Sequence, residues 1–188
     1  MKEKVKSKKI EKMEKSKPGG KAVLSGERVF SNSKEAFTLY EQSRFGEPIE
    51  GKIYYSIVEA LYLVEKGRLN IYIGKKKLSF DRFLEKAQEL ENGFYVRFVV
   101  YRDMRNRGYI VKTALKFGAD FRIYDKGIKP GQEHARWVLY PVYESSSLTW
   151  HEFAAKNRVA HSTKKRLLIG IVDDENDVTY YEVDWKRP

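Results

Sequence analysis

The chain has 188 residues, carries a formal net charge of +11 and contains no cysteine. This length fits one large or two small domains, and the lack of cysteine excludes disulfides, thiolate metal sites and a cysteine nucleophile. Apolar residues make up 41% of the chain and charged residues 34%, so it can bury a core and is not disordered as a whole. No apolar run approaches the ~20 residues that a membrane span needs, and the sequence shows no signal peptide. We therefore expect a cytoplasmic protein with no membrane partner.

The positive charge is unevenly distributed along the chain. Residues 1–21 contain nine lysines and three glutamates, which leaves +6 of the +11 in this segment. The segment has few apolar residues and ends near a Pro-Gly-Gly sequence, so we expect a disordered or frayed tail. Two interpretations remain open, namely non-specific attraction of phosphates and a solubilising tail with no further role.

Residues 22–92 have the pattern of a small α/β domain. Ser56 and Glu59 form a capping box before apolar residues at helical spacing, and Gly67 is placed to end that helix. Ser79 is a second helix cap, for a helix over 80–90 that ends before the predicted domain boundary at Gly93. Strands are expected at 22–31, with a turn at Gly26, and at 69–73. This part of the chain shows no cluster of catalytic residue types.

Residues 93–188 predict a mixed sheet with helices packed on it. Aromatic residues at three- and four-residue steps favour a helix from Phe94 to Gly108, and Thr149 with Glu152 forms a capping box for a helix over 150–162. We expect that second helix to bury Phe153, Ala154, Val159 and Ala160. Strands are expected at 109–115, 119–125, 136–144, 166–173 and 178–185. The fold class is therefore mixed α/β.

Three blocks of the second half, at 107–127, 133–139 and 158–173, resemble in order and spacing the archaeal-type tRNA-intron splicing endonucleases. The segments 56–69 and 75–87 resemble the N-terminal domain of the same family. The resemblance covers roughly residues 22–188 and leaves out the basic tail. It implies a catalytic C-terminal domain of restriction-endonuclease-like type. It also implies precursor tRNA with a bulge-helix-bulge structure as the substrate, and no metal or other cofactor.

The resemblance places the catalytic residues of the family on Tyr124, His134 and Lys165. It implies that Tyr124 is the general base, His134 the general acid, and Lys165 the charge that stabilises the transition state. The products would be a 2′,3′-cyclic phosphate and a 5′-hydroxyl, so the enzyme would be a tRNA-intron lyase. An unperturbed phenol has a pKa of ~10, so a tyrosine base needs cationic neighbours, and Lys165 is the candidate.

The residues themselves are compatible with these roles but do not demand them. Tyr124 ends a predicted strand, and His134 precedes the next one, in positions where scaffolds display reactive groups. Lys165 lies in 156–166, which contains five basic residues and no acidic one. Each feature also has an ordinary structural interpretation, as an edge tyrosine or a solvated helix end. We assign His151 to the surface and leave His161 out of the catalytic set; the histidines show no metal-ligand spacing.

The resemblance also implies how RNA is held and how subunits assemble. Arg158, and with a weaker match Trp185, would hold a splayed base between them. An acidic loop would insert into a basic cleft on a neighbouring dimer, and the final strand would pair with its copy to form the dimer. The residues of this assembly loop are Asp173, Asp174, Glu175 and Asp177. A homotetramer built as a dimer of dimers is favoured, and a heterotetramer with this chain as the catalytic subunit remains open.

Two alternative functions were weighed. The first is a non-catalytic RNA-binding or structural subunit of the same complex, although such subunits lose the catalytic residues that are present here. The second is a metal-dependent DNA nuclease, which needs clustered carboxylates at the scissile phosphate. Asp120 and Glu133 do not form that pattern, so this alternative is disfavoured.

Overall fold

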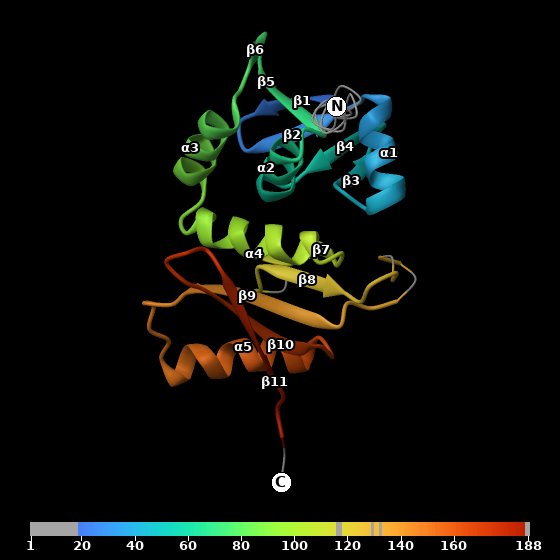
Figure 1. Ribbon diagram of the computed structural model, residues 1–188. Coiled ribbons are helices and arrows are strands. Elements are labelled where there is room, and N and C mark those ends of the chain that lie inside the picture. The colour runs from blue at the N-terminus through green and yellow to red at the C-terminus, as the bar shows by residue number, and fades with distance from the viewer. Residues whose placement is uncertain (1–18, 116–117, 129, 132, 187–188) are drawn as a thin grey trace, which may run out of the picture.

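The computed structural model describes residues 19–115, 118–128, 130–131 and 133–186. The chain forms two lobes, each built on one β-sheet. Helix α4 (Phe94–Asn106), the first element of the C-terminal lobe, lies between the two sheets (Figure 1). Both sheets contain parallel and antiparallel neighbours, and five helices lie within the described residues. The predicted mixed α/β class is confirmed. The expected tail over residues 1–21 falls almost entirely outside the described part of the chain.

The N-terminal lobe contains a six-stranded sheet in the order β3-β4-β2-β1-β5-β6. Strands β1 and β5 are parallel, and the other neighbours are antiparallel. Helix α2 begins at the predicted capping box, in which both the Ser56 and the Glu59 side chains are engaged. The strands are β1 (Gly20–Ser25), β2 (Arg28–Ser31), β3 (Glu47–Ile49), β4 (Lys52–Tyr55), β5 (Leu69–Ile73) and β6 (Lys76–Lys77), and the helices are α1 (Lys34–Ser43), α2 (Ile57–Glu65) and α3 (Phe80–Leu90).

The C-terminal lobe contains a five-stranded sheet in the order β11-β10-β9-β8-β7. Strands β9 and β10 are parallel and are joined through α5, which covers one face of the sheet, while α4 packs against the other (Figure 1). At Gly170 of β10, an added Cβ would lie 3.2 Å from Val100 of α4, so this packing is close. The elements are α4 (Phe94–Asn106), β7 (Ile110–Thr113), β8 (Phe121–Tyr124), β9 (Trp137–Tyr143), α5 (Trp150–Ser162), β10 (Arg166–Val172) and β11 (Val178–Val183).

One hydrophobic core connects the two lobes. The same cluster of buried residues includes Ile71 of the first sheet, Leu61 of α2, Tyr101 of α4 and Ile123 of the second sheet. The predicted boundary at Gly93 falls in the short connection between α3 and α4, where Gly93 has a φ of 67°. As a division between two domains, the boundary stays a prediction.

A buried ion pair also joins the lobes. The Lys112 ammonium of β7 donates to the Glu59 carboxylate of α2 at 3.3 Å and to the Gly46 carbonyl at 2.6 Å. The Gly46 amide donates to the same carboxylate at 3.2 Å, and the Ser56 amide to its other oxygen at 3.1 Å. Because both oxygens accept hydrogen bonds, the buried charges are well compensated. This network fixes β7, and with it the edge of the second sheet, against the N-terminal lobe.

Candidate active site at one end of the C-terminal sheet

Three strand ends meet at one end of the C-terminal sheet. The Arg136 amide donates to the Ile123 carbonyl at 2.9 Å, and the Arg166 amide donates to the Arg136 carbonyl at 3.0 Å. These bonds align the last residues of β8 with the first residues of β9 and β10. Neighbouring strands lie about 4.8 Å apart. Tyr124 and Lys165 therefore lie at the same end of the sheet, on strands separated only by β9.

The register also places Tyr124 and Lys165 on the same face of the sheet. Arg122 pairs with Val138, and Val138 pairs with Leu167, so these three side chains share one face. Because side chains alternate along a strand, Tyr124 and Lys165 point to that face as well. It is the face covered by α5, since Val138 and Leu167 belong to the core cluster beneath that helix. Tyr124 is 5% exposed, so packing holds its ring in place.

The end of α5 fixes the position of Lys165. The Lys165 amide donates to the Ala160 carbonyl at 2.9 Å and the Lys164 amide to the His161 carbonyl at 3.0 Å, which is the Schellman arrangement at a helix C-terminus. Lys164 takes the left-handed conformation that this motif requires, with a φ of 54°. The Lys165 ammonium donates to the Thr163 carbonyl at 2.8 Å. Burial, and then the nearby positive charge of Arg122, lower the pKa of Lys165 below the ordinary value for lysine.

His134 lies in the connection between β8 and β9, only two residues before Arg136, and its side chain is exposed. Two residues of extended chain span at most about 7 Å, so the backbone of His134 lies close to the aligned strand ends. The next residue, Ala135, is buried and anchors this part of the connection. The structure thus brings the three predicted catalytic residues to one end of one sheet. Their chemical roles stay predictions.

The basic stretch 156–166 does not form a single patch. Lys165 points to the α5 face, whereas Arg166 pairs with Trp137 and points to the opposite face. There, Arg166 bonds to Glu182 at 2.5 Å, and that carboxylate also accepts a hydrogen bond from the Trp137 indole at 2.6 Å. These bonds lower the pKa of Glu182. Strand alternation therefore separates two charges that are adjacent in sequence.

Arg158 and Trp185 line one mainly apolar groove of about 720 Å³ between α5 and the end of the chain. Val183 of β11 pairs with Leu167 at the start of β10, so the groove lies at the same end of the sheet as Lys165. The His161 ring lies 4.6 Å from the Trp185 ring, measured between centroids. His161 follows Arg158 by three residues on α5, and residues at this spacing lie on the same face of a helix. This spacing could have predicted from the sequence that both side chains line the groove.

One sequence prediction about α5 is wrong. Ala154 is exposed and lines the groove instead of being buried. Ala160 is buried, and Phe153 and Val159 are partly buried against the sheet. The helix has only one fully buried residue because it covers the sheet along a narrow stripe. Its remaining apolar side chains therefore contribute to the groove and the surface.

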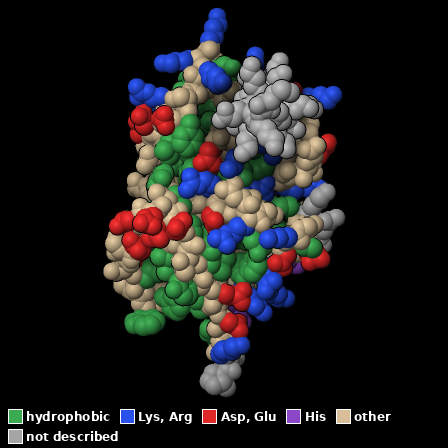
Figure 2. Space-filling model, in the orientation of Figure 1, with side chains coloured by type: hydrophobic (Ala, Val, Ile, Leu, Met, Phe, Trp, Pro, Cys, Tyr) green, Lys and Arg blue, Asp and Glu red, His purple; other side chains and the backbone are tan. Residues whose placement is uncertain are grey.

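The acidic turn lies at the opposite end of the same sheet, between β10 and β11. The Asp173 carboxylate accepts hydrogen bonds from the Glu175 amide at 3.0 Å and the Asp177 amide at 2.9 Å. Asp173 is therefore engaged in holding the turn. Asp174, Glu175 and Asp177 are exposed, and the Asp174 carboxylate accepts a hydrogen bond from the Tyr143 hydroxyl. Acidic side chains gather on the left side of the molecule where this turn lies (Figures 1 and 2).

Within 19–186, apart from the gaps given above, no three His, Asp or Glu side chains are grouped as metal ligands would be. None of the helices in this part of the chain has the length and apolar character needed to cross a bilayer.

Comparison with known proteins identifies the family. Residues 94–180 match the family model for the tRNA intron endonuclease catalytic C-terminal domain, and residues 20–84 match the model for the N-terminal domain. The first match contains the three predicted catalytic residues and Arg158, and it ends before Trp185. Both lobes thus correspond to units of one class of RNA-processing nucleases.

Similar proteins agree with this assignment. The tRNA-splicing endonuclease of Thermococcus onnurineus is 40% identical over 165 residues, which cover 87% of this chain and 95% of that protein. The one from Nanoarchaeum equitans is 48% identical over 138 residues, covering 70% and 88%. The one from Methanothermobacter thermautotrophicus is 41% identical over 150 residues, covering 80% and 87%. The chain belongs to the tRNA intron endonuclease family, which confirms the resemblance seen in the sequence.

The electrostatics of Lys165 can be tested directly. Replacing Arg122 with Gln removes the positive charge that opposes protonation of Lys165, so the pKa of Lys165 should rise toward the ordinary value of about 10.4. An NMR titration of the lysine side-chain carbons next to the ammonium measures this change. The matched control is Arg166→Gln, because that side chain points to the other face. An unchanged or lowered pKa in Arg122→Gln would contradict the arrangement.

Proposed function

We propose that this chain is a tRNA-splicing endonuclease that cleaves precursor tRNA at its exon–intron junctions. The observation that carries the proposal is the alignment of three strand ends. Because of this alignment, Tyr124 and Lys165 lie on the same face at one end of the C-terminal sheet. His134 precedes Arg136, one of the aligned residues, by only two positions. The match of residues 94–180 to a catalytic domain supports it further.

The proposed reaction is an intramolecular transesterification. Tyr124 accepts the proton of the ribose 2′-hydroxyl, whose oxygen attacks the adjacent phosphorus. The bond from phosphorus to the 5′-oxygen breaks, and His134 donates a proton to that leaving oxygen. The products are a 2′,3′-cyclic phosphate and a 5′-hydroxyl, so the reaction is that of a lyase and consumes no water.

Lys165 and Arg122 supply fixed positive charge near the reacting phosphate. Charge that is already in place stabilises the developing negative charge in the transition state without further reorganisation. The Thr163 carbonyl holds the Lys165 ammonium, and the helix end holds its backbone. With an ammonium in this role, and proton transfer by a phenol and an imidazole, the mechanism requires no metal ion.

The groove beside this site would take an unstacked base of the RNA bulge. Arg158 and Trp185 line it, and an aromatic ring and a guanidinium are the groups that hold splayed bases by stacking and cation–π contact. The expected substrate therefore has a bulge-helix-bulge structure, with an unpaired base available at each junction.

Cleavage in the presence of excess EDTA tests the proposed reaction. The purified protein should cut a precursor tRNA at both junctions as fast with EDTA as with Mg²⁺, because no step needs a metal. End analysis should find a cyclic phosphate on the 5′ fragment. Cleavage that EDTA abolishes, or a fragment with a free 3′-hydroxyl, would refute the mechanism.

The variant His134→Ala tests whether His134 acts in catalysis and not in RNA binding. It should bind the RNA with an affinity within a factor of about two, while cleavage falls by about 10²–10⁴-fold, the range that general acid–base catalysis contributes. His151→Ala, on the exposed side of α5, serves as the control. If His134→Ala cuts at the wild-type rate, the catalytic assignment fails. A wild-type protein that binds but does not cut would favour the alternative of a non-catalytic subunit.

The assembly is proposed to be a homotetramer. Strand β11 is at the edge of its sheet, and Tyr181 on it is 56% exposed, so the strand is available to pair with a second copy. At the other end of the sheet, the acidic turn projects three exposed carboxylates. These would enter a basic cleft on a neighbouring dimer. A heterotetramer would instead need a second kind of chain.

Neutralising the acidic turn should split the assembly. The triple variant Asp174→Asn, Glu175→Gln, Asp177→Asn keeps Asp173, which holds the turn, so the fold should persist. Light scattering should show the mass of four chains for the wild type and of two chains for the variant. The control removes three exposed carboxylates from α3, at Asp81, Glu85 and Glu89. A wild type that is not tetrameric, or a tetramer that survives the variant, would contradict the proposed assembly.

The cytoplasmic location expected from the sequence stays a prediction. The lack of cysteine supports it, because such a chain needs no oxidising compartment for folding.

A further inference from the structure

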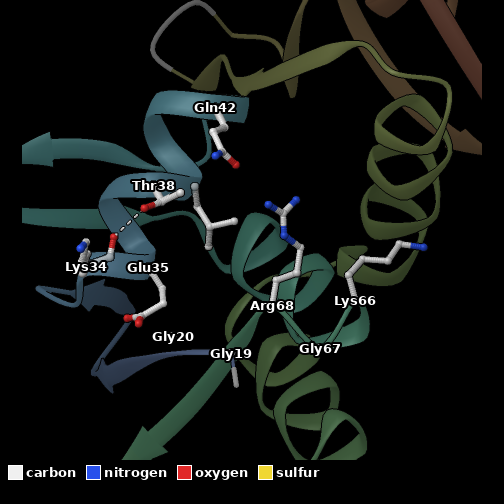
Figure 3. A pocket seen from close by; sticks show the side chains of 10 residues that line it. Gly19, Gly20, Lys34, Glu35, Thr38, Gln42, Lys66, Gly67 and Arg68 are labelled. Atoms are coloured by element: carbon white, nitrogen blue, oxygen red, sulfur yellow. Dashed lines mark hydrogen bonds between the residues drawn. The ribbon is translucent and has the colours of Figure 1, made fainter. Parts of the chain in front are cut away.

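A concavity with basic lining residues lies in the N-terminal lobe, away from the candidate active site. This α1 cleft has a volume of about 510 Å³ and runs between helix α1 and the connection from α2 to β5. Figure 3 shows its lining side chains, with Arg68 reaching from that connection toward Gln42 of α1. The lining residues are Gly19, Gly20, Lys34, Glu35, Thr38, Leu39, Gln42, Lys66, Gly67 and Arg68.

The backbone of the cleft is rigidly defined. Helix α2 ends in a Schellman motif, in which the Arg68 amide donates to the Leu63 carbonyl at 2.8 Å and Gly67 has a φ of 65°. The Gly20 amide donates to the Arg68 carbonyl at 3.1 Å. A Cβ at Gly19 would lie 2.7 Å from the Gly67 carbonyl oxygen, so this close approach requires glycine. The Arg68 side chain thus extends into the cleft from a backbone position that these hydrogen bonds fix.

The cations of the cleft are exposed and mostly lack partners. Within the described part of the chain, the Lys34 and Arg68 side chains make neither an ion pair nor a hydrogen bond. The Lys66 ammonium lies 3.7 Å from the Glu65 carboxylate and 5.4 Å from the centroid of the Tyr62 ring. Three cations and one carboxylate, Glu35, give the lining a net charge of +2. Figure 3 shows Arg68 reaching toward α1, Lys34 on α1 at one side of the cleft, and the Lys66 side chain pointing away from α1.

The sequence that precedes the cleft residue Gly19 is also rich in lysine. Residues 1–18 contain eight lysines and three glutamates, and they precede Gly19, which lines the cleft. The sequence of residues 1–18 has a net charge of +5. Lysine-rich segments contribute to phosphate binding without reading sequence. The Gln42 amide on α1 can also donate hydrogen bonds to phosphate or ribose oxygens, whereas the Thr38 hydroxyl already donates to the Lys34 carbonyl at 3.1 Å.

We propose that the α1 cleft binds the phosphodiester backbone of the substrate RNA outside the cleavage junctions. This inference rests on the proposed function, since it takes the same RNA as ligand. The cleft belongs to the first sheet and its helices, whereas the junction is held at the second sheet, so the two contacts fall on different parts of the RNA (Figure 1). The cleft would add affinity for the body of the tRNA that is independent of sequence.

Equilibrium binding of two RNAs tests the proposal. One RNA is a complete precursor tRNA and the other is a short bulge-helix-bulge duplex, both carrying 2′-deoxy nucleotides at the junctions so that no cleavage can occur. The double variant Lys34→Gln, Arg68→Gln should raise the Kd for the complete RNA about 10-fold near 0.15 M salt. The slope of log K against log salt should fall by about 2, one unit for each lost contact. The Kd for the short duplex should change less than twofold.

The control variant Lys86→Gln, Arg82→Gln removes the same charge from the exposed surface of α3 and should leave both Kd values unchanged. An equal loss for both RNAs, or no loss for the complete RNA, overturns the proposal. Unchanged RNA affinity with a tetramer reduced to dimers would also overturn it, because the cleft would then bind the acidic turn of another copy. If the wild type binds both RNAs but leaves an unmodified precursor uncut, the proposed function fails while the binding comparison remains valid.

Discussion

Two backbone hydrogen bonds determine the geometry on which the catalytic proposal depends. They run from the Arg136 amide to the Ile123 carbonyl and from the Arg166 amide to the Arg136 carbonyl. They align the end of β8 with the starts of β9 and β10, and alternation along the strands then directs Tyr124 and Lys165 to one face. A shift of either register by one residue would turn a proposed catalytic side chain to the opposite face. The core beneath α5 resists such a shift, because Val138 and Leu167 would leave it.

The N-terminal lobe supports this arrangement through its contacts with α4 and β7. The aromatic side chains of α4 belong to the same hydrophobic core as the first sheet. The Lys112–Glu59 ion pair attaches β7 to helix α2 of the N-terminal lobe. Removing one partner of such a buried pair costs roughly 3–5 kcal/mol, because the other charge remains buried without compensation. The lobe therefore has a structural part in forming the site. We propose a second part for it, in binding RNA through the α1 cleft.

The sequence predicted the elements whose stability is local. Capping boxes at Ser56 and Thr149 marked two helix starts correctly, and the aromatic spacing from Phe94 predicted α4. Helix α1 was not predicted: it buries only Ala36 and Leu39, although the Ser33 side chain caps it by accepting a hydrogen bond from the Ala36 amide. The sequence also could not separate Lys165 from Arg166 by face or pair Lys112 with Glu59, because both depend on contacts between distant segments. The family resemblance supplied the candidate catalytic residues, and composition alone would not have done so.

The most direct measurement of the central claim is a crystal structure of the protein bound to a precursor RNA with 2′-deoxy nucleotides at its junctions. The account predicts that the scissile phosphate lies beside the Lys165 ammonium, with the Tyr124 hydroxyl on the side of the missing 2′-oxygen and the His134 ring next to the 5′-oxygen. A phosphate bound at the opposite end of the sheet would contradict it, and so would a His134 ring that lies away from the 5′-oxygen.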